Sequence, residues 1–117
     1  MPRILVCGDR EWENTEAIVR ELSKLPPGTV IIEGEARGAD SIARDVAIGL
    51  GFEVLRFPAN WVMHGKKAGP LRNRQMADDG HPDEVWAFHA NIVASKGTKD
   101  MVGYARKKGI PVKIFTE

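Results

Sequence analysis

Four positive charges and no acid stand in the stretch Gly65–Met76, GKKAGPLRNRQM, of a chain whose formal net charge is only +1. The cations are Lys66, Lys67, Arg72 and Arg74. A planar guanidinium suits phosphate or carboxylate, and a lysine adds a mobile positive charge. Because the whole chain is nearly neutral, this cluster predicts a local anion site rather than a generally basic surface.

Two other stretches carry the glycines, small side chains and hydroxyls of a phosphate cradle. GEARGAD supplies Gly34, Gly38, Ala39 and Asp40, and ASKGT supplies Ser95, Lys96, Gly97 and Thr98. Backbone N–H groups at a helix start, with the helix dipole, hold phosphate. Each stretch is equally compatible with an ordinary turn in which Asp40 or Ser41 caps one helix and Ser95 or Thr98 caps the next.

Further candidates follow the first and third apolar runs. Gly8, Asp9 and Arg10 stand in GDREW, which could also be a turn with a surface ion pair. Trp61 could stack on a base or fill the core, and the core is the commoner place for a lone tryptophan. The candidates from the third loop are Asn60, Trp61, Lys67, Gly69, Arg72 and Asn73, of which Asn60, like Asp9 and Asp40, could accept from ribose hydroxyls.

Other chemistries find little support. His64, His81 and His89 have no metal-ligand spacing, and the chain has no CxxC pair. Cys7 lies within an apolar run, which favours a buried thiol over a nucleophile. Ser95 lacks the G-x-S-x-G surroundings of a hydrolase serine. We therefore expect no metal site and no separate cofactor.

The elements that must position these residues alternate regularly. Strands are predicted at 3–8, 29–34, 53–57, 84–88 and 111–116, and helices at 14–25, 40–51, 70–79 and 98–109. Such alternation predicts an α/β fold with one five-stranded parallel sheet and helices on both faces. Ligands of such sheets bind beyond the carboxyl ends of the strands, where the strand order reverses. The loops after the first four strands therefore form the expected site.

Local signals support these elements. Asn14 caps the first helix, Pro26 and Pro27 end it, and Pro70 opens the third. In the second helix, Ile42, Val46 and Leu50 are predicted to form the buried stripe.

Composition sets broad limits. A chain of 117 residues with 43% apolar content suits one domain, 1–117, with its own core. A single cysteine precludes an internal disulfide and favours the cytoplasm. No apolar run approaches the length of a membrane span, and the start, MPRILVCGDR, lacks a signal-peptide pattern.

With these residues in place, the chain resembles the YspA-like group of the SLOG superfamily. The resemblance rests on GDR, EGEARGADSIA, FPANW followed by GKKAGPLRNRQM, and SKGTKDMV, in order over nearly the whole chain. That group is related to the Lonely Guy phosphoribohydrolases and to the Rossmann domain of the DNA-processing protein DprA. The resemblance implies a Rossmann-like three-layer sandwich that binds a nucleotide or nucleotide-derived ligand and forms homo-oligomers.

Residue roles carry over in part. RNRQM is similar to the arginine–lysine motif of the Lonely Guy enzymes, which places Arg72 as the arginine and Asn73 where they have lysine. ASKGTKDM retains the Gly97–Thr98 pair of their PGGxGTxxE motif, whereas Met101 occupies the position of the catalytic glutamate. Asp100 is adjacent, but one residue moves a helical side chain by about 100° around the axis. Arg72 and Asp100 are thus the catalytic candidates.

Three functions remain open. The first is binding of an AMP-, ADP-ribose- or NAD-related ligand, as a sensor or sequestering protein. The second is hydrolysis of an N-glycosidic or phosphoribosyl bond, which requires a carboxylate such as Glu35, Asp40 or Asp100. The third is DNA binding, which the near-neutral charge disfavours.

Overall fold

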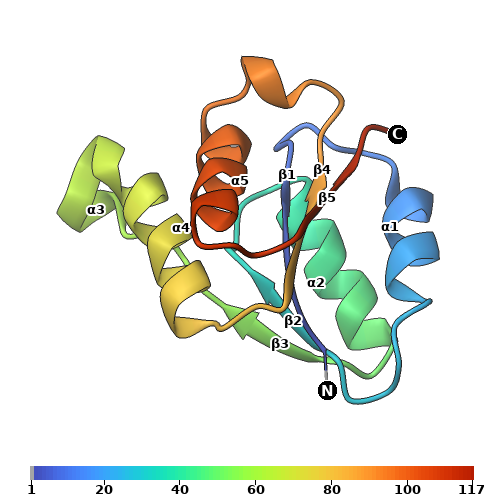
Figure 1. Cartoon of the computed structure of the whole chain (residues 1–117). Helices are drawn as coiled ribbons and strands as arrows, with labels where there is room; N and C mark the ends of the chain where they lie inside the picture. Colours follow the sequence, from blue (N-terminus) through green and yellow to red (C-terminus); the bar gives the residue numbers. More distant parts are fainter. Residues whose placement is uncertain (1) are drawn as a thin grey trace.

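The computed structural model describes residues 2–117 and contains one parallel sheet. Its strands are β1 (Arg3–Gly8), β2 (Val30–Glu33), β3 (Glu53–Arg56), β4 (Glu84–Phe88) and β5 (Val112–Phe115). They lie in the order β3-β2-β1-β4-β5 (Figure 1). The chain first builds outward from β1 to β3 and then returns to the other side of β1, so the strand order reverses between β1 and β4.

The helices cover both faces, which confirms the predicted α/β Rossmann-like sandwich. They are α1 (Thr15–Leu22), α2 (Ala39–Gly49), α3 (Trp61–His64), α4 (Ala68–Asp79) and α5 (Gly97–Lys107), with 3₁₀ turns η1 (Gly65–Lys67) and η2 (Ile92–Ala94). Helices α1 and α2 lie on one face of the sheet, and α4 and α5 lie on the other (Figure 1).

The core follows from the alternation of side chains along the buried strands. Ile4 and Val6 of β1 pack toward α1 and α2, whereas Leu5 and Cys7 pack toward α4 and α5. In register, Leu5 pairs with Ile32 on one side and with Val85 on the other. Strands with apolar residues on both faces are typical of a parallel sheet covered by helices.

Two helical expectations were wrong. Helix α1 ends at Leu22 rather than at Leu25, four residues before Pro26. In α2 the buried face consists of Ala39, Asp40, Ala43 and Ala47, whereas Leu50 is exposed. Alanines allow the helix to lie close to the sheet, so the larger Ile42 and Val46 sit beside this face and are only partly buried.

The segment 58–69, expected to be a loop, contains α3 and η1. Helix α4 begins at Ala68, so Pro70 is its third residue rather than its first. Proline is tolerated there because N–H groups of a first turn have no partner within the helix. Similarly, the expected loop 89–97 includes η2.

Two of the three tryptophans belong to the core. Trp86 is 4% exposed and Trp12 is 8% exposed, and Trp12 contacts Phe88 edge-to-face at 5.7 Å between ring centroids. The expectation that Trp86 is a core residue is confirmed. Across residues 2–117, none of the helices has the length and apolar character needed to span a membrane.

Candidate functional site

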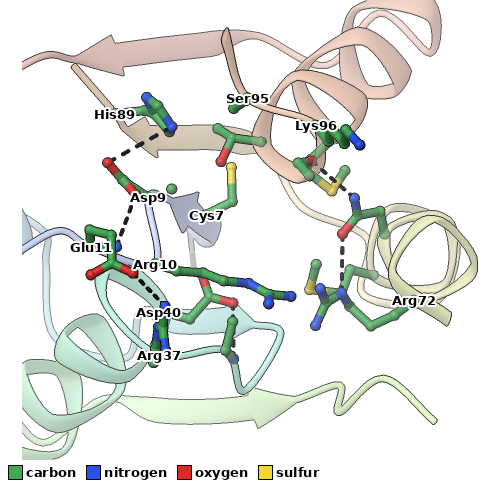
Figure 2. A pocket seen from close by; sticks show the side chains of 17 residues that line it. Cys7, Asp9, Arg10, Glu11, Arg37, Asp40, Arg72, His89, Ser95 and Lys96 are labelled. Carbon is green, nitrogen blue, oxygen red and sulfur yellow. Dashed lines mark hydrogen bonds and ion pairs between the residues drawn. The ribbon is translucent and has the colours of Figure 1, made fainter. Parts of the chain in front are cut away.

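A crevice of about 340 Å³ opens beyond the carboxyl ends of β1 and β4, where the strand order reverses (Figure 2). The loops after β1, β2 and β4, the start of α5 and the residues Arg72, Asn73 and Met76 of α4 form its walls. Ten predicted site residues line it: Gly8, Asp9, Arg10, Asp40, Arg72, Asn73, Ser95, Lys96, Gly97 and Thr98.

The start of α5 forms one wall with free donors. Within residues 2–117, the N–H groups of Gly97 and Thr98 have no hydrogen-bond acceptor, whereas the N–H of Lys99 donates to Ser95 Oγ at 3.0 Å. Gly97 begins the helix and Lys96 is its cap, so neither Ser95 nor Thr98 occupies the cap position itself. Gly97 and Thr98 both line the crevice, and a Cβ on Gly97 would meet no atom within 4 Å.

The loop after β2, in contrast, uses its own donors. Asp40 Oδ2 accepts hydrogen bonds from the N–H groups of Gly34 at 3.1 Å and Ala36 at 3.4 Å. The N–H of Ala39 donates to the Asp9 carbonyl at 3.1 Å. The N–H groups of Gly34, Ala36 and Ala39 therefore already have acceptors, whereas those of Asp40 and Ser41 have none among residues 2–117.

The capping expected for α2 was also wrong. Gly38 is the N-cap, with φ +75°, and a Cβ there would overlap the Asp9 carbonyl. Ser41 Oγ donates to Gly38 O at 3.1 Å instead of capping the helix, and Asp40 lies within it. Gly38 thus allows the loops after β1 and β2 to come into contact.

Arg72 reaches across the crevice from α4. Its Nη1 donates to the Gly34 carbonyl, and its Nε donates to Asn73 Oδ1 at 3.1 Å. A Cβ on Gly34 would overlap the guanidinium, so the glycine provides the space for it. Two contacts within the protein therefore hold the arginine in place.

Asn73 acts as a link rather than as an open donor. It is 4% exposed, and its Nδ2 donates to Gly97 O at 3.2 Å and to Asp100 Oδ2 at 3.0 Å. It therefore ties α4 to the start of α5 and fixes the two walls relative to each other.

Positive charge predominates in the crevice. Arg10, Arg37, Arg72 and Lys96 line it, and Arg37 forms an ion pair with Glu11. Burial lowers the pKa of Arg72, nearby Asp40 raises it, and the like charge of Arg10 lowers it further. An arginine remains protonated under any ordinary condition, so Arg10 and Arg72, which form no ion pair within residues 2–117, keep their positive charge in the crevice.

Two acidic groups in the wall have raised pKa values. Burial raises the pKa of Asp40 from 3.8 to about 6, against the opposing influence of Arg72. Burial also raises the pKa of the Cys7 thiol well above its usual range. Cys7 therefore stays protonated and buried, as expected, while Asp40 can exchange a proton near neutral pH.

Sequence reasoning missed Arg37 and His89 in the crevice. His89 Nδ1 accepts from the N–H of Asn91 at 2.9 Å, which leaves its Nε2 3.9 Å from Asp9 Oδ2. His89 directly follows β4, so its position at the carboxyl edge of the sheet was the available signal. Arg37 lies between Ala36 and Gly38, and the small side chains of this stretch were its only feature that indicated a phosphate site.

A second cavity of about 430 Å³ adjoins the crevice. Trp61, which lines it, is 49% exposed, so the expectation that a lone tryptophan fills the core was wrong here. Arg10 Cζ lies 5.7 Å from its ring centroid. Gly34 also lines this second cavity rather than the crevice.

Several predicted residues lie outside both cavities. Asn60 Oδ1 accepts from the N–H of Met63 at 3.0 Å and caps α3. Lys67 is exposed in η1, and Gly69 is buried in α4 against the edge of Trp61. Gly38 and Ala39 act through the backbone contacts described above. Within residues 2–117, no three carboxylate, histidine or cysteine side chains are grouped as a metal site requires.

Comparison with known proteins gives the same assignment. Residues 2–64 match the model of the "YspA, cpYpsA-related SLOG family". The chain belongs to this SLOG family. It is 41% identical over 124 aligned residues to the Gene 61 protein of Mycobacterium phage D29, covering 98% of this chain and 97% of that one.

The fold also resembles a solved structure, DNA processing protein A (DprA) from Streptococcus pneumoniae, with a TM-score of 0.56 and 16% identity. The match covers 99% of this SLOG chain and 59% of the DprA chain, so the chain spans less than two thirds of that protein. At this identity the likeness concerns the fold. Family and fold together are consistent with a nucleotide-related role and with small-molecule binding.

In this SLOG protein, Asp100 does not face the crevice. Its Oδ2 accepts from Asn73 and lies 3.2 Å from Arg74 Nη1, and the residue lines a separate hollow on the outer side of α5. Arg74 and Asp100 thus form an ion pair between α4 and α5. Met101 lines the crevice instead and is 1% exposed. A catalytic part for Asp100 stays a prediction that this geometry does not support.

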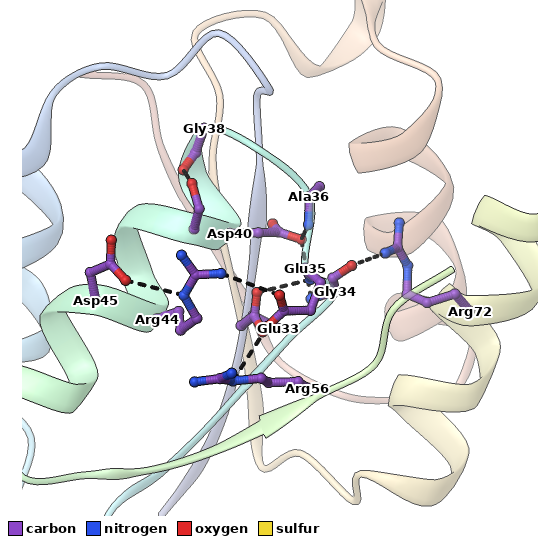
Figure 3. Close-up of polar contacts among 11 residues, drawn as sticks. Glu33, Gly34, Glu35, Ala36, Gly38, Asp40, Arg44, Asp45, Arg56 and Arg72 are labelled. Carbon is purple, nitrogen blue, oxygen red and sulfur yellow. Dashed lines mark hydrogen bonds and ion pairs between the residues drawn. The ribbon is translucent and has the colours of Figure 1, made fainter. Parts of the chain in front are cut away.

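Behind Arg72 lies a cluster of carboxyl groups and arginines (Figure 3). Glu33 is fully buried, its Oε1 accepts from the N–H of Glu35 at 2.8 Å, and its Oε2 has no partner among the described residues. Glu35 has φ +57° and lies 3.2 Å from Arg44 and 3.4 Å from Arg56, the latter without hydrogen-bond geometry. Burial first, and then the neighbouring Glu35 carboxyl, raises the pKa of Glu33 to about 8.

Proposed function

We propose that this SLOG protein binds a nucleotide or nucleotide-derived ligand in the crevice, as a sensor or sequestering protein. The observation that carries the proposal is that two kinds of phosphate-binding group line the same crevice. The unpaired N–H groups of Gly97 and Thr98 lie on one wall, and the pre-positioned guanidinium of Arg72 lies on the other. A phosphate between them would be held by a helix start and by charge-assisted hydrogen bonds.

Size and polarity support the same ligand class. A cavity of about 340 Å³ falls in the range of sites that enclose small molecules. Asp9 and Asp40 line its wall and would accept hydrogen bonds from sugar hydroxyls. Lys96 adds a positive charge beside the start of α5.

A thermal-shift and calorimetric panel tests this proposal with AMP, ADP-ribose, NAD and cyclic nucleotides, and with adenosine as the control without phosphate. A ligand that binds only the native state raises the midpoint of unfolding. We expect stabilisation by phosphate-bearing members and none by adenosine. If no member shifts the midpoint at millimolar concentration, the proposed function is wrong.

A hydrolase is the second candidate, and the position of Asp40 favours it. Asp40 is the one among the carboxylates Glu35, Asp40 and Asp100 that lines the crevice itself, and its pKa of about 6 suits proton transfer near neutral pH. In this reaction water oxygen bonds to the anomeric carbon, and the carbon–nitrogen bond breaks with its electron pair passing to the base. The Asp40 carboxylate takes the proton that the water loses and passes it to the leaving base of a nucleoside monophosphate. Nicotinamide leaves NAD as a neutral base, so in that case the proton passes to solvent.

Incubation with nucleoside monophosphates and NAD, followed by chromatography for free base, decides between the two candidates. If Asp40 is the acid–base group, the wild type releases base and Asp40→Asn stops the release while nucleotide binding persists. Asparagine can still accept the hydrogen bonds of Gly34 and Ala36 through its oxygen. A wild type that binds nucleotide without releasing base excludes hydrolysis of these substrates.

A further inference from the structure

We propose that Glu33 is a positioning residue of the crevice, and that its proton keeps the full charge of Arg72 available to a bound anion. Glu33 lines neither cavity, so it would act on a ligand only through Arg72 and through the loop that holds this arginine. When Glu33 loses its proton, the affinity of the crevice for an anionic ligand should fall. This inference rests on the proposed function, since it concerns an anion bound at Arg72.

Glu33 is a carboxyl group without the surroundings that a buried charge requires. It ends β2 and is 0% exposed. Its Oε1 accepts from the N–H of Glu35 at 2.8 Å, but its Oε2 has no hydrogen-bond partner among residues 2–117. A buried carboxylate with such an oxygen is costly, whereas the protonated form carries no charge into the interior. The burial and the contacts of Glu33 therefore favour its neutral, protonated form.

Charged groups from four parts of the chain lie around Glu33 (Figure 3). They are Glu35 in the loop after β2, Asp40 and Arg44 of α2, Arg56 of β3 and Arg72 of α4. Arg44 and Arg56 form ion pairs with Glu35, whereas Arg72 has no ion pair within residues 2–117. A negative charge on Glu33 would therefore attract the Arg72 guanidinium and repel an anion bound to it.

The backbone of Gly34 connects Glu33 to Arg72 directly. The Gly34 carbonyl accepts from Arg72, and its N–H donates to Asp40 Oδ2 at 3.1 Å. The next N–H, that of Glu35, is the one that Glu33 holds, and Glu35 has φ +57°, which is uncommon for a residue with a side chain. These three contacts fix the turn that presents the carbonyl to Arg72. A change of charge on Glu33 thus acts on the support of the arginine as well as on its charge.

The change of charge falls in a pH range that separates Glu33 from the acids of the crevice wall. Burial and the neighbouring Glu35 carboxyl raise the pKa of Glu33 to about 8. Asp40, with a pKa of about 6, titrates below this range, and burial keeps the pKa of Cys7 well above it. Glu33 is therefore neutral below pH 8 and negative above it, so anion affinity should fall as pH rises. By linkage, a bound anion must in turn raise the pKa of Glu33.

Calorimetric titration at pH 7, 8 and 9 tests the inference with ADP-ribose as the probe, because its pyrophosphate keeps the same charge throughout. We expect wild type to bind about fivefold more weakly at pH 9 than at pH 7, and Glu33→Gln to keep its affinity within about twofold. The glutamine oxygen can still accept from the N–H of Glu35. Glu53→Gln is the matched control and should keep the wild-type profile, because Glu53 is exposed on β3 and lines neither cavity. A residue with a structural role alone would change the affinity by the same factor at every pH.

Nuclear magnetic resonance of the wild-type protein measures the same coupling without a ligand. We expect the side-chain carboxyl carbon of Glu33 to titrate near pH 8 and the Nε–H resonance of Arg72 to move with the same midpoint. An Arg72 resonance that does not follow Glu33, or the same pH profile of affinity in Glu33→Gln and wild type, would overturn the inference and leave the proposed function standing. If no nucleotide binds, the proposed function is wrong, and the Arg72 resonance alone decides whether Glu33 acts on the arginine.

Discussion

Glu33 and Glu35 support the loop that receives Arg72. Glu33 Oε1 holds the N–H of Glu35, and the carbonyl of the intervening Gly34 accepts from Arg72. Because burial and the neighbouring Glu35 carboxyl raise the pKa of Glu33 to about 8, this buried side chain is mostly protonated at neutral pH. The protonated Glu33 is thus adjacent in sequence to Gly34, whose carbonyl accepts from Arg72.

This proton predicts a pH dependence of stability. A carboxyl whose pKa is higher in the folded than in the unfolded state stabilises the protein below the unfolded pKa, near 4.5, and loses that contribution as pH rises through about 8. Glu33→Gln mimics the protonated acid. We expect its free energy of unfolding, relative to wild type, to rise between pH 5 and pH 9.

Urea denaturation at pH 5, 7 and 9 measures this difference. Glu53→Gln is the control, because Glu53 is exposed on β3 and should not change the slope in the same way. Parallel pH profiles for Glu33→Gln and wild type would contradict a Glu33 carboxyl that stays protonated in the folded protein at neutral pH.

At the scale of elements, the starts of α2 and α5 differ although both looked like phosphate cradles. At the α2 start, Gly34, Ala36 and Ala39 donate to Asp40 and to the Asp9 carbonyl, and the N–H groups of Asp40 and Ser41 have no partner among the described residues. At the α5 start, the first two N–H groups of the helix, those of Gly97 and Thr98, have no partner among the described residues. Gly38 is the residue on which the contact with Asp9 depends, because its positive φ and missing side chain let the β1 loop approach.

Gly38→Ala should therefore destabilise the protein by more than about 1 kcal/mol, since φ is positive and a Cβ would overlap Asp9 O. Gly103→Ala is the matched control within α5, where a Cβ meets no atom within 4 Å. It should stabilise by roughly 0.5–1 kcal/mol, the helix-interior preference for alanine. Urea midpoints measure both, and a shift of the same sign in the two variants would contradict this account of Gly38.

The elements show what the sequence could and could not predict. Each strand was placed to within one residue at either end, because apolar runs bounded by turn residues are typical of buried strands. Helix α3 was missed because four residues are too few to show a helical period. The buried alanine face of α2 was missed because the larger apolar residues Ile42, Val46 and Leu50 indicated that a different side of the helix is buried.

The sequence indicated those residues whose place in the site follows from their position after a strand. It did not indicate the contacts that depend on a partner from another part of the chain. Arg72, Gly97 and Thr98 follow from loops at the carboxyl edge of the sheet. Asp40 accepts hydrogen bonds from its own loop, and Asp100 forms an ion pair with Arg74. Residue spacing in the sequence does not reveal these contacts.

For the whole molecule, the reversal of strand order brings the arginines to one place. Their charge is local, since the net charge of the chain is +1, and this continues to disfavour a broad nucleic-acid surface. The oligomeric state, the cytoplasmic location and the single-domain organisation stay predictions. The central claim concerns the start of α5, where the phosphate of the ligand should bind.

Titration of ADP-ribose into Gly97→Asp and Gly103→Asp tests that claim most directly. Both variants change the net charge equally, and a Cβ at either glycine meets no atom within 4 Å. A carboxylate at a helix start is favourable for the helix but would occupy the phosphate position and repel it. We predict at least a tenfold loss of affinity for Gly97→Asp and less than a twofold change for Gly103→Asp. Equal affinities in the two variants would contradict the account.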